Sequence, residues 1–400
     1  MTDRIPGEAG RMNPYERNIP IVYVTGFLRG LVFFLPIFAL YVQQELFTVL
    51  NVTLIIATNA IVNTVFEVPS GAFADLFGRK NTLLLAGALL IVSIGCLTVG
   101  DTLTFFLLYA VLNGIAESLF SGTDTAILHD SLKANGQEGR FKKVLGVSGS
   151  LWPLGATLSS LIGGFLAAQS LLLPVAVTII PFSLAFLLTF LITEPPYERE
   201  THGNIWRQMR DGFRTVITKR QVLLLSIAGF LAYAFGEVAH QLKPLFFAAK
   251  AIPIEAYGII FAVAFGLSSL GYLASHAVSE RVGNKTTLVW CAIITAVTLI
   301  GAVYAPGLWA AAILVSGSFF WGLRWPVVDH LLNAAAPSKH RVTVISFGNL
   351  ANKIGLALFA PLFGYLADAY TINTVFALLA FPSFWVAVVF LMLKPDAEAA

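Results

Sequence analysis

Long uninterrupted apolar stretches dominate the pattern of hydrophobic and polar positions along this chain. Residues 144–193 hold no Asp, Glu, Lys, Arg or His over 50 positions, and residues 286–323 hold none over 38. An α-helix needs about 20 apolar residues to cross the roughly 30 Å hydrocarbon core of a bilayer. Each of the two stretches is therefore long enough for two membrane-spanning helices.

Similar stretches recur along the whole chain and predict twelve spans. Lipid offers no hydrogen-bond partner to the backbone, so a spanning segment must be a helix or part of a closed barrel. A barrel would show short alternating segments instead of unbroken apolar runs. The predicted spans lie near residues 18–41, 51–75, 81–100, 103–127, 141–168, 172–193, 221–248, 255–279, 285–305, 308–333, 342–368 and 372–393.

Composition agrees with an all-α membrane protein. Hydrophobic residues make up 57% of the chain and charged residues only 12%, and the mean hydropathy is +0.79. Soluble proteins carry about 25% charged residues. Cys96 and Cys291 both fall inside predicted spans, so the sequence predicts neither a disulfide framework nor a metal site.

The basic residues gather in alternate loops, which predicts the orientation. With the N-terminal tail in the cytoplasm, 20 of the 25 Lys and Arg residues fall on that side and only Lys250 falls in an opposite loop. Cytoplasmic loops carry the excess of Lys and Arg, so both termini are predicted to be cytoplasmic. The N-terminus shows no cleavable signal peptide, and the compact loops favour a bacterial inner membrane.

A connector separates the two sets of six spans. Apolar residues recur at helical spacing in it, and basic residues fill much of the rest, which is typical of an amphipathic helix in the headgroup region. A solvated basic connector is the alternative. The predicted organisation is an N-tail (1–17), a six-helix bundle (18–193), this linker (194–220), a second six-helix bundle (221–393) and a C-tail (394–400).

The two sets of spans are related by an internal repeat. Gly78 and Gly283 lie 205 residues apart, and Asp124 and Asp329 are separated by the same 205. Parallel repeats of this kind occur in transporters, whose substrate site lies near the middle of the membrane between the repeats. The repeat therefore predicts two pseudo-symmetric bundles around a central cavity.

A short motif lies in the loop between the second and third spans. It reads Gly71-Ala-Phe-Ala-Asp75-Leu-Phe-Gly78-Arg79-Lys80. It resembles the signature loop of the major facilitator superfamily, and residues 280–285 hold a degenerate copy at the equivalent place in the second half. The resemblance implies a twelve-helix transporter fold and a latch between the two halves on the cytoplasmic side.

The cytoplasmic gate implied by this resemblance includes residues beyond the loop. Asp75 is expected at the N-terminus of a neighbouring helix, where a negative charge is favoured. Asp124 and Asp130 are expected to meet Arg79 or Arg140. A purely topological basic loop is the alternative reading. The predicted gate residues are Gly71, Asp75, Gly78, Arg79, Lys80, Asp124 and Arg140.

Charged and aromatic residues inside the spans form a second candidate site. A charge at the bilayer centre costs about 2.5–3.5 kcal/mol on insertion scales, so it needs a partner or a function. Such charges fall on the first, fourth, seventh, tenth and eleventh spans, whereas every third span carries none. The resemblance implies that the first four of these helices line the cavity. The candidates are Arg29, Glu117, Glu237, His240, Trp321, Arg324, Trp325 and Lys353.

These candidates admit two readings. They could bind substrate and carry protons, with Glu117 or Glu237 as the proton acceptor. They could instead form structural ion pairs, for example Arg29 with either of these acids. Trp321 lies one turn before Arg324, so its indole could stack on the guanidinium; ordinary packing is the alternative.

The sequence thus predicts a secondary transporter that moves a small amphipathic, zwitterionic or anionic solute by alternating access, coupled to protons in the direction of efflux. Many antiporters of the superfamily carry an arginine at the position of Ala110, so proton-coupled uptake stays open, as does a lipid flippase or scramblase. No enzyme motif, cofactor, metal site or nucleic-acid partner is predicted. The expected partners are a small-molecule substrate, protons and membrane lipids, and the chain is expected to be a monomer.

Overall fold

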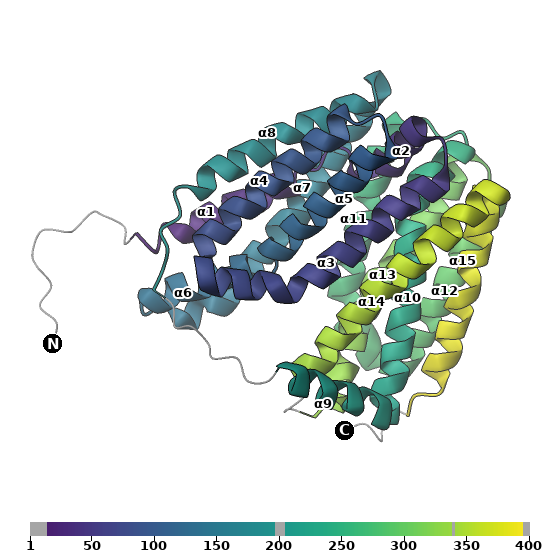
Figure 1. Ribbon diagram of the computed structural model, residues 1–400. Helices are drawn as coiled ribbons and strands as arrows, with labels where there is room; N and C mark the ends of the chain where they lie inside the picture. Colours follow the sequence, from purple (N-terminus) through teal and green to yellow (C-terminus); the bar gives the residue numbers. More distant parts are fainter. Residues whose placement is uncertain (1–13, 197–204, 338–340, 395–400) are drawn as a thin grey trace, which may run out of the picture.

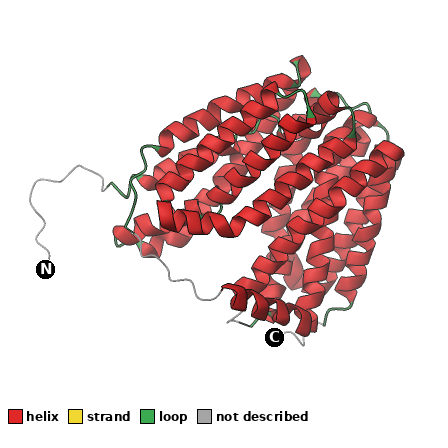
Figure 2. Cartoon of the chain, in the orientation of Figure 1, coloured by secondary structure: helices red, strands yellow, loops and turns green. Residues whose placement is uncertain are grey.

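The computed structural model describes residues 14–196, 205–337 and 341–394, and within them the regular elements are all helices (Figure 2). The first part contains α1 (Asn18–Gly30), η1 (Leu35–Ile37), α2 (Phe38–Leu46), α3 (Val49–Phe77), α4 (Arg79–Val99), α5 (Leu103–Phe120), α6 (Thr123–Ala134), η2 (Glu138–Arg140), α7 (Phe141–Gln169) and α8 (Leu172–Thr189). The rest contains α9 (Ile205–Thr218), α10 (Arg220–Ala249), α11 (Glu255–Val282), α12 (Asn284–Tyr304), α13 (Gly307–Ala335), α14 (Arg341–Ala369) and α15 (Ile372–Leu391).

The described residues contain 12 helical segments long and apolar enough to cross a membrane, which confirms the predicted number. Ten of the predicted spans correspond to a single helix each. The first is divided into α1, η1 and α2, and the fourth into α5 and α6. The predicted N-tail and C-tail, and the first part of the linker, lie largely outside the described residues.

The break in the first span places non-helical backbone at membrane depth, where each polar group needs a partner. The N–H of Phe33 donates to the Thr178 hydroxyl at 3.2 Å, and the Ser159 hydroxyl donates to the Gly30 carbonyl at 3.4 Å. Pro36, within the 3₁₀ turn, has no N–H to satisfy. The break is therefore stabilised by α7 and α8, which lie far along the chain.

The helices form two bundles that lie side by side (Figure 1). Helices α1–α8 make the first bundle and α10–α15 the second, with α3 packed against α14 and α7 against α11 across the interface. We call the end where α1 begins and α15 ends the basic end, because its loops carry Lys and Arg, and the other end the opposite end. In Figure 1 the bundles approach each other at the opposite end and diverge toward the basic end.

The bundles are joined tightly at the opposite end. Asp368 of α14 accepts hydrogen bonds from the backbone N–H groups of Val49 and Leu50, 2.8 Å each, at the start of α3. A second contact at this end joins α7 and α11. The two helices lie so close that a Cβ at Gly164 would lie 2.9 Å from the Gly258 nitrogen. Small residues permit this approach of two helices in a membrane. We refer to these two contacts as the opposite-end seal.

The predicted helix in the linker is confirmed as α9. It packs against α14 and α10 of the second bundle. The Phe213 ring lies 5.7 Å from the Phe347 ring, and Val216 packs against a small apolar cluster that includes Val222. One face of α9 is thus fixed to the second bundle at the basic end, while Ile217 stays exposed.

Candidate functional site

A chain of polar side chains crosses from the second bundle to the first. Lys353 Nζ on α14 donates to Asn63 Oδ1 at 2.6 Å and lies 2.6 Å from a carboxylate oxygen of Glu67, both on α3. Asn63 in turn donates to the Glu117 carboxylate on α5 at 3.3 Å. We call these four residues the cross-bundle network. The Lys353–Glu67 ion pair of this network links the two bundles within the membrane spans.

The acids of this network face open space although they lie on membrane-spanning helices. Glu117 is exposed, and 51% of the Glu67 side chain is accessible. Both carboxylates are therefore accessible, although Glu67 is paired with a lysine of the other bundle. One turn along, Asn59 donates to the Asn113 amide oxygen at 3.1 Å, which continues the polar contact between α3 and α5.

Sequence reasoning missed Asn59 and Asn63 of this polar strip and noticed Glu67 only as a residue near the cytoplasmic end of the second span, without connecting it to Lys353. Asn59, Asn63 and Glu67 recur every four residues, so one face of α3 presents all of them. A search for polar residues at this spacing inside an apolar helix would have found the strip. A search restricted to charges in mid-span found only Glu117 and Lys353.

Arg29 lies away from the cross-bundle network. It forms an ion pair with Asp124 of α6, and its guanidinium lies 3.9 Å from the centre of the Phe120 ring. These residues border a small pocket inside the first bundle, which we call the first-bundle pocket. The predicted pairing of Arg29 with Glu117 or Glu237 is therefore wrong, because the Asp124 carboxylate of α6 pairs with the guanidinium instead.

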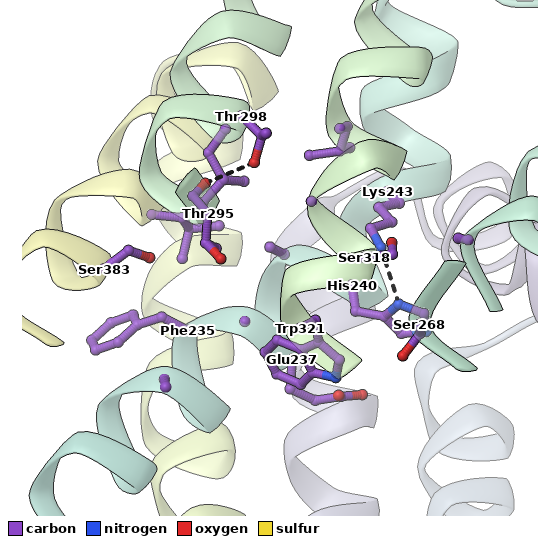
Figure 3. Close-up of a pocket in the computed structure, with 18 of the residues that line it drawn as sticks. Phe235, Glu237, His240, Lys243, Ser268, Thr295, Thr298, Ser318, Trp321 and Ser383 are labelled. Carbon is purple, nitrogen blue, oxygen red and sulfur yellow. Dashed lines mark hydrogen bonds between the residues drawn. The ribbon is translucent and has the colours of Figure 1, made fainter. Parts of the chain in front are cut away.

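A cavity lies mainly inside the second bundle, and we call it the second-bundle pocket (Figure 3). Its volume is about 400 Å³, within the usual range for small-molecule sites. Leu35 and Trp152 of the first bundle complete its wall. Its other polar and charged lining residues come from α10–α13 and α15: Glu237, His240, Gln241, Lys243, Ser268, Thr295, Thr298, Ser318, Trp321, Arg324 and Ser383.

Helix α10 contributes a polar face to this pocket. Gln241 donates to the Glu237 carboxylate at 2.8 Å, and Lys243 Nζ lies 3.3 Å from His240 Nδ1 (Figure 3). The His240 ring also packs against Phe261, with ring centres 5.6 Å apart. His240 thus combines a polar contact within α10 and an aromatic contact with α11.

Arg324 is the buried cation of this pocket. Only 5% of the residue is accessible, and its guanidinium carbon lies 4.5 Å from the centre of the Trp321 ring. The predicted stacking of these two side chains is confirmed. Trp325 lies 5.4 Å from the same cation. Nη2 of Arg324 is buried without a hydrogen-bond partner among the described groups.

The eight predicted cavity residues divide into two sets. Glu237, His240, Trp321 and Arg324 line the second-bundle pocket together. The other four are not among its lining residues: Glu117 and Lys353 belong to the cross-bundle network, Arg29 to the first-bundle pocket, and Trp325 packs behind Trp321 against Tyr233.

The signature loop is bound to other elements of the first bundle. Gly78 has φ +91°, which favours glycine, and the Glu194 carboxylate accepts hydrogen bonds of 2.7 Å from the backbone N–H groups of Arg79 and Lys80. Glu194, not Asp75, thus takes the place that we expected for an acid at a helix N-terminus. The sequence marks Glu194 as the first acid after the long uncharged stretch.

The basic side chains of the loop have partners at the basic end. Arg79 pairs with Asp130 at 2.9 Å, as one of the expected combinations, and Lys80 donates to the Phe190 carbonyl at the end of α8 at 2.8 Å. Asp124 does not meet Arg79 or Arg140, because it pairs with Arg29.

Two other predicted gate residues, Gly71 and Arg140, do not take part in these contacts. Gly71 is exposed on α3, and Arg140 donates to the side chain of Gln137, three residues before it.

The second half repeats this geometry in reduced form. Gly283 has φ +86°, and Lys285 donates to the Leu393 carbonyl at 2.8 Å, as Lys80 does at the end of α8. A lysine at a helix C-terminus satisfies a free carbonyl and interacts favourably with the helix dipole. The degenerate copy therefore retains the turn and the lysine contact.

Twelve spans in two repeated bundles, with a polar network between them and a solute-sized pocket, define a membrane transporter. The sequence model of the Major Facilitator Superfamily matches residues 22–248 and residues 225–400, so the chain belongs to this superfamily. Its relatives are transporters and not enzymes.

Individual relatives resemble the chain over most of its length. An uncharacterized MFS-type transporter of Bacillus subtilis, YxaM, is 24% identical over 375 residues, which cover 90% of this chain and 92% of that protein. The quinolone resistance protein NorA of Staphylococcus aureus is 22% identical over 365 residues, covering 88% and 92%.

Solved structures share the fold. The nucleoside transporter NupG superimposes with a TM-score of 0.78 at 14% identity, over 95% of this chain and 98% of that one. A D-xylose-proton symporter gives a TM-score of 0.75 at 16% identity, over 96% and 99%.

Proposed function

We propose that this protein is a proton-coupled secondary transporter that exports a small amphipathic, zwitterionic or anionic solute by alternating access. The cross-bundle network carries this proposal. Lys353 is bonded to Asn63 and Glu67 across the interface, and Asn63 connects them to Glu117. Because the Lys353 bonds join the two bundles, they must break and form again whenever one bundle moves against the other.

The network offers a physical route for coupling. A proton on Glu67 or Glu117 removes a negative charge that attracts the Lys353 ammonium, so it weakens the link between the bundles. A ligand or proton shifts a two-state protein by its difference in affinity for the two states. Protons thereby change the balance between the two conformations, and both acids are exposed, so they can exchange protons.

The comparisons supply support for the ion and the direction. One protein of the same fold is a D-xylose-proton symporter, and the Staphylococcus relative is a quinolone resistance protein. We accordingly favour protons as the coupling ion and export as the direction. Proton-coupled uptake uses the same network in reverse. A lipid flippase or scramblase would instead need a lateral opening between the bundles.

The charge distribution supports the remaining features. The loops that the sequence assigns to one side carry nearly all the loop Lys and Arg, which supports a basic end in the cytoplasm of a bacterial inner membrane. The diverging bundles then open to the cytoplasm. Helix α9 lies at this end in the headgroup region, and the proposed functional unit is the monomer.

Proton movement in proteoliposomes with a trapped pH dye tests the proposal. The wild type, Lys353→Gln and Glu117→Gln would be challenged with a panel of organic anions, zwitterions and cations. We expect solute-dependent pH changes in the wild type and at least tenfold slower changes in both variants, because each removes a charge of the network. Lys142→Gln, which alters an exposed lysine of α7, is the matched control.

Wild-type rates in Lys353→Gln would contradict the role of the network. A separate experiment in everted membrane vesicles assigns the direction of transport. Accumulation of the solute driven by an acidic vesicle interior supports export, whereas accumulation of the solute only in right-side-out vesicles supports uptake.

A further inference from the structure

The first-bundle and second-bundle pockets occupy equivalent places in the repeat. Gly87 on α4 and Ala292 on α12 line them 205 residues apart, the spacing of the repeated glycines. Phe182 on α8 and Ser383 on α15 each directly follow a proline and line the same two pockets. A comparison between the halves therefore shows what each bundle does with the same space.

The first bundle fills this space. Its pocket has only about 10 Å³ of free volume, because Phe182, Leu90 and the Arg29–Asp124 ion pair occupy it. In the second bundle Ser383 stands in place of Phe182, and Thr295 lies 205 residues after Leu90. The smaller, hydroxyl-bearing side chains leave a cavity of about 400 Å³.

The halves also differ in how they neutralise a buried cation. Arg29 has the Asp124 carboxylate, whereas Arg324 has no ion pair among the described residues and an unbonded Nη2. Asp329, the counterpart of Asp124 in the repeat, is exposed on α13. A buried charge is retained at a high cost unless a partner neutralises it, so the Arg324 site lacks an anion.

The remaining lining indicates what kind of anion fits. Lys243 adds a second positive charge to the pocket and Glu237 one negative charge, so one cationic charge is left over when His240 is neutral. Aromatic side chains from α10, α11 and α13 supply an apolar wall, with Phe235, Phe265 and Trp321 among them. A ligand of matching chemistry has one negative charge and an apolar or aromatic body.

We propose that the second-bundle pocket binds an organic monoanion, with its carboxylate on the Arg324 guanidinium and its apolar body against the aromatic wall. Arg324 lines the cavity, Trp321 lies over its guanidinium, and its Nη2 has no hydrogen-bond partner among the described groups, so the guanidinium retains donor capacity for a carboxylate. This inference rests on the proposed function in so far as the anion is the transported solute; the binding itself is independent of transport.

Calorimetric titration of the full chain in detergent tests this site with three probes of similar size. Benzoate carries the negative charge, benzyl alcohol is neutral and benzylamine is cationic. We expect the wild type to bind benzoate at least tenfold more tightly than either of the other two probes. Arg324→Gln should lower the benzoate affinity at least tenfold and abolish the preference over benzyl alcohol.

A second variant tests the site without removing the cation. Ser383→Phe introduces the residue that fills the first-bundle pocket, so it should also weaken benzoate binding at least tenfold. Lys142→Gln should bind like the wild type. Equal binding of benzoate and benzyl alcohol to the wild type, or unchanged benzoate affinity in both pocket variants, would overturn the inference.

Two outcomes separate this inference from the proposed function. Absence of benzoate binding, together with proton movement that depends on Lys353, would overturn the anion site alone. Benzoate binding that depends on Arg324, with no proton movement from any solute, would support the site and overturn the proposed proton-coupled transport.

Discussion

Two arginines of this chain lie within membrane spans, and their positive charges are compensated in different ways. Arg29 pairs with a carboxylate from a neighbouring element, whereas Arg324 is covered by tryptophan rings. Loss of one member of an ion pair leaves the other charge buried without compensation. Loss of a cation that has no carboxylate partner leaves no such charge behind.

This difference predicts opposite effects on stability. Arg29→Ala should destabilise the protein by about 1–3 kcal/mol, because it leaves Asp124 without its partner. The double variant Arg29→Ala/Asp124→Ala should recover part of this loss. Arg324→Gln should leave the melting temperature nearly unchanged or raise it. Thermal unfolding in detergent measures all three variants, and an equal drop for Arg29→Ala and Arg324→Gln would contradict this account.

The sequence predicted the contact between neighbours in a helix, and it offered the distant Arg79–Asp130 pair only as one of several combinations, whereas it failed for the partner of Arg29. Trp321 and Arg324 are one helical turn apart, so their stacking follows from helical periodicity alone. The partner of Arg29 lies 95 residues away on a helix whose start depends on the Gly122 turn. Periodicity cannot say which of several carboxylates such a turn brings inward.

At the scale of elements, the opposite-end seal depends on two helix contacts. The Asp368 carboxylate binds two free N–H groups at the start of α3, and such a charge at a helix N-terminus contributes about 0.3–1 kcal/mol. Since these groups belong to different bundles, the contact stabilises only the conformation in which this end is closed.

Asp368→Ala should therefore shift the protein toward a conformation open at the opposite end, by about fivefold for a loss of about 1 kcal/mol. The shift can be read by thiol labelling of Ala167→Cys, a position on α7 that is only 5% exposed, after both native cysteines are replaced by serine. Asp101→Ala removes an exposed acid at the same end and should leave labelling unchanged. Equal labelling in both backgrounds would show that Asp368 does not stabilise the seal.

The number of spans could be read from the sequence, but their internal breaks could not. Apolar length sets the number, because each crossing needs a long lipid-compatible helix. Gly30 and Pro36 hint at a break in the first span, yet either residue is also tolerated within a membrane helix. The break persists because Ser159 and Thr178 bond its backbone, and these partners are known only once α7 and α8 are packed beside it.

At the scale of the whole molecule, the repeat produces two bundles of similar architecture but different content. The first closes its internal space with an ion pair and a phenylalanine, whereas the second leaves it open around Arg324. The sequence predicted the 6+6 arrangement from the matched glycines and acids. It did not predict this asymmetry, because the size of each cavity depends on side chains from five or more helices at once.

The orientation of the whole molecule decides what the observed conformation means. With the basic end in the cytoplasm, the space beside Glu117 and Glu67 opens inward, and an exporter would load its solute there. With the reverse orientation the same conformation would face outward and suit uptake. The 20 basic residues on one side and the single Lys250 on the other favour the first arrangement, because positively charged loops are retained on the cytoplasmic side.

Reporter fusions test this orientation in a bacterial host. Green fluorescent protein fused to the C-terminus should fluoresce, and alkaline phosphatase at the same place should be inactive, since only the former matures in the cytoplasm. A fusion truncated at Ser170, in the loop between α7 and α8 at the opposite end, should give the inverse result. An active phosphatase at the C-terminus would place the diverging bundles on the outer side. The orientation inferred from the charge asymmetry would then be wrong, and so would the export direction. The cross-bundle network and the Arg324 pocket would keep their physical basis, because neither depends on which side is cytoplasmic.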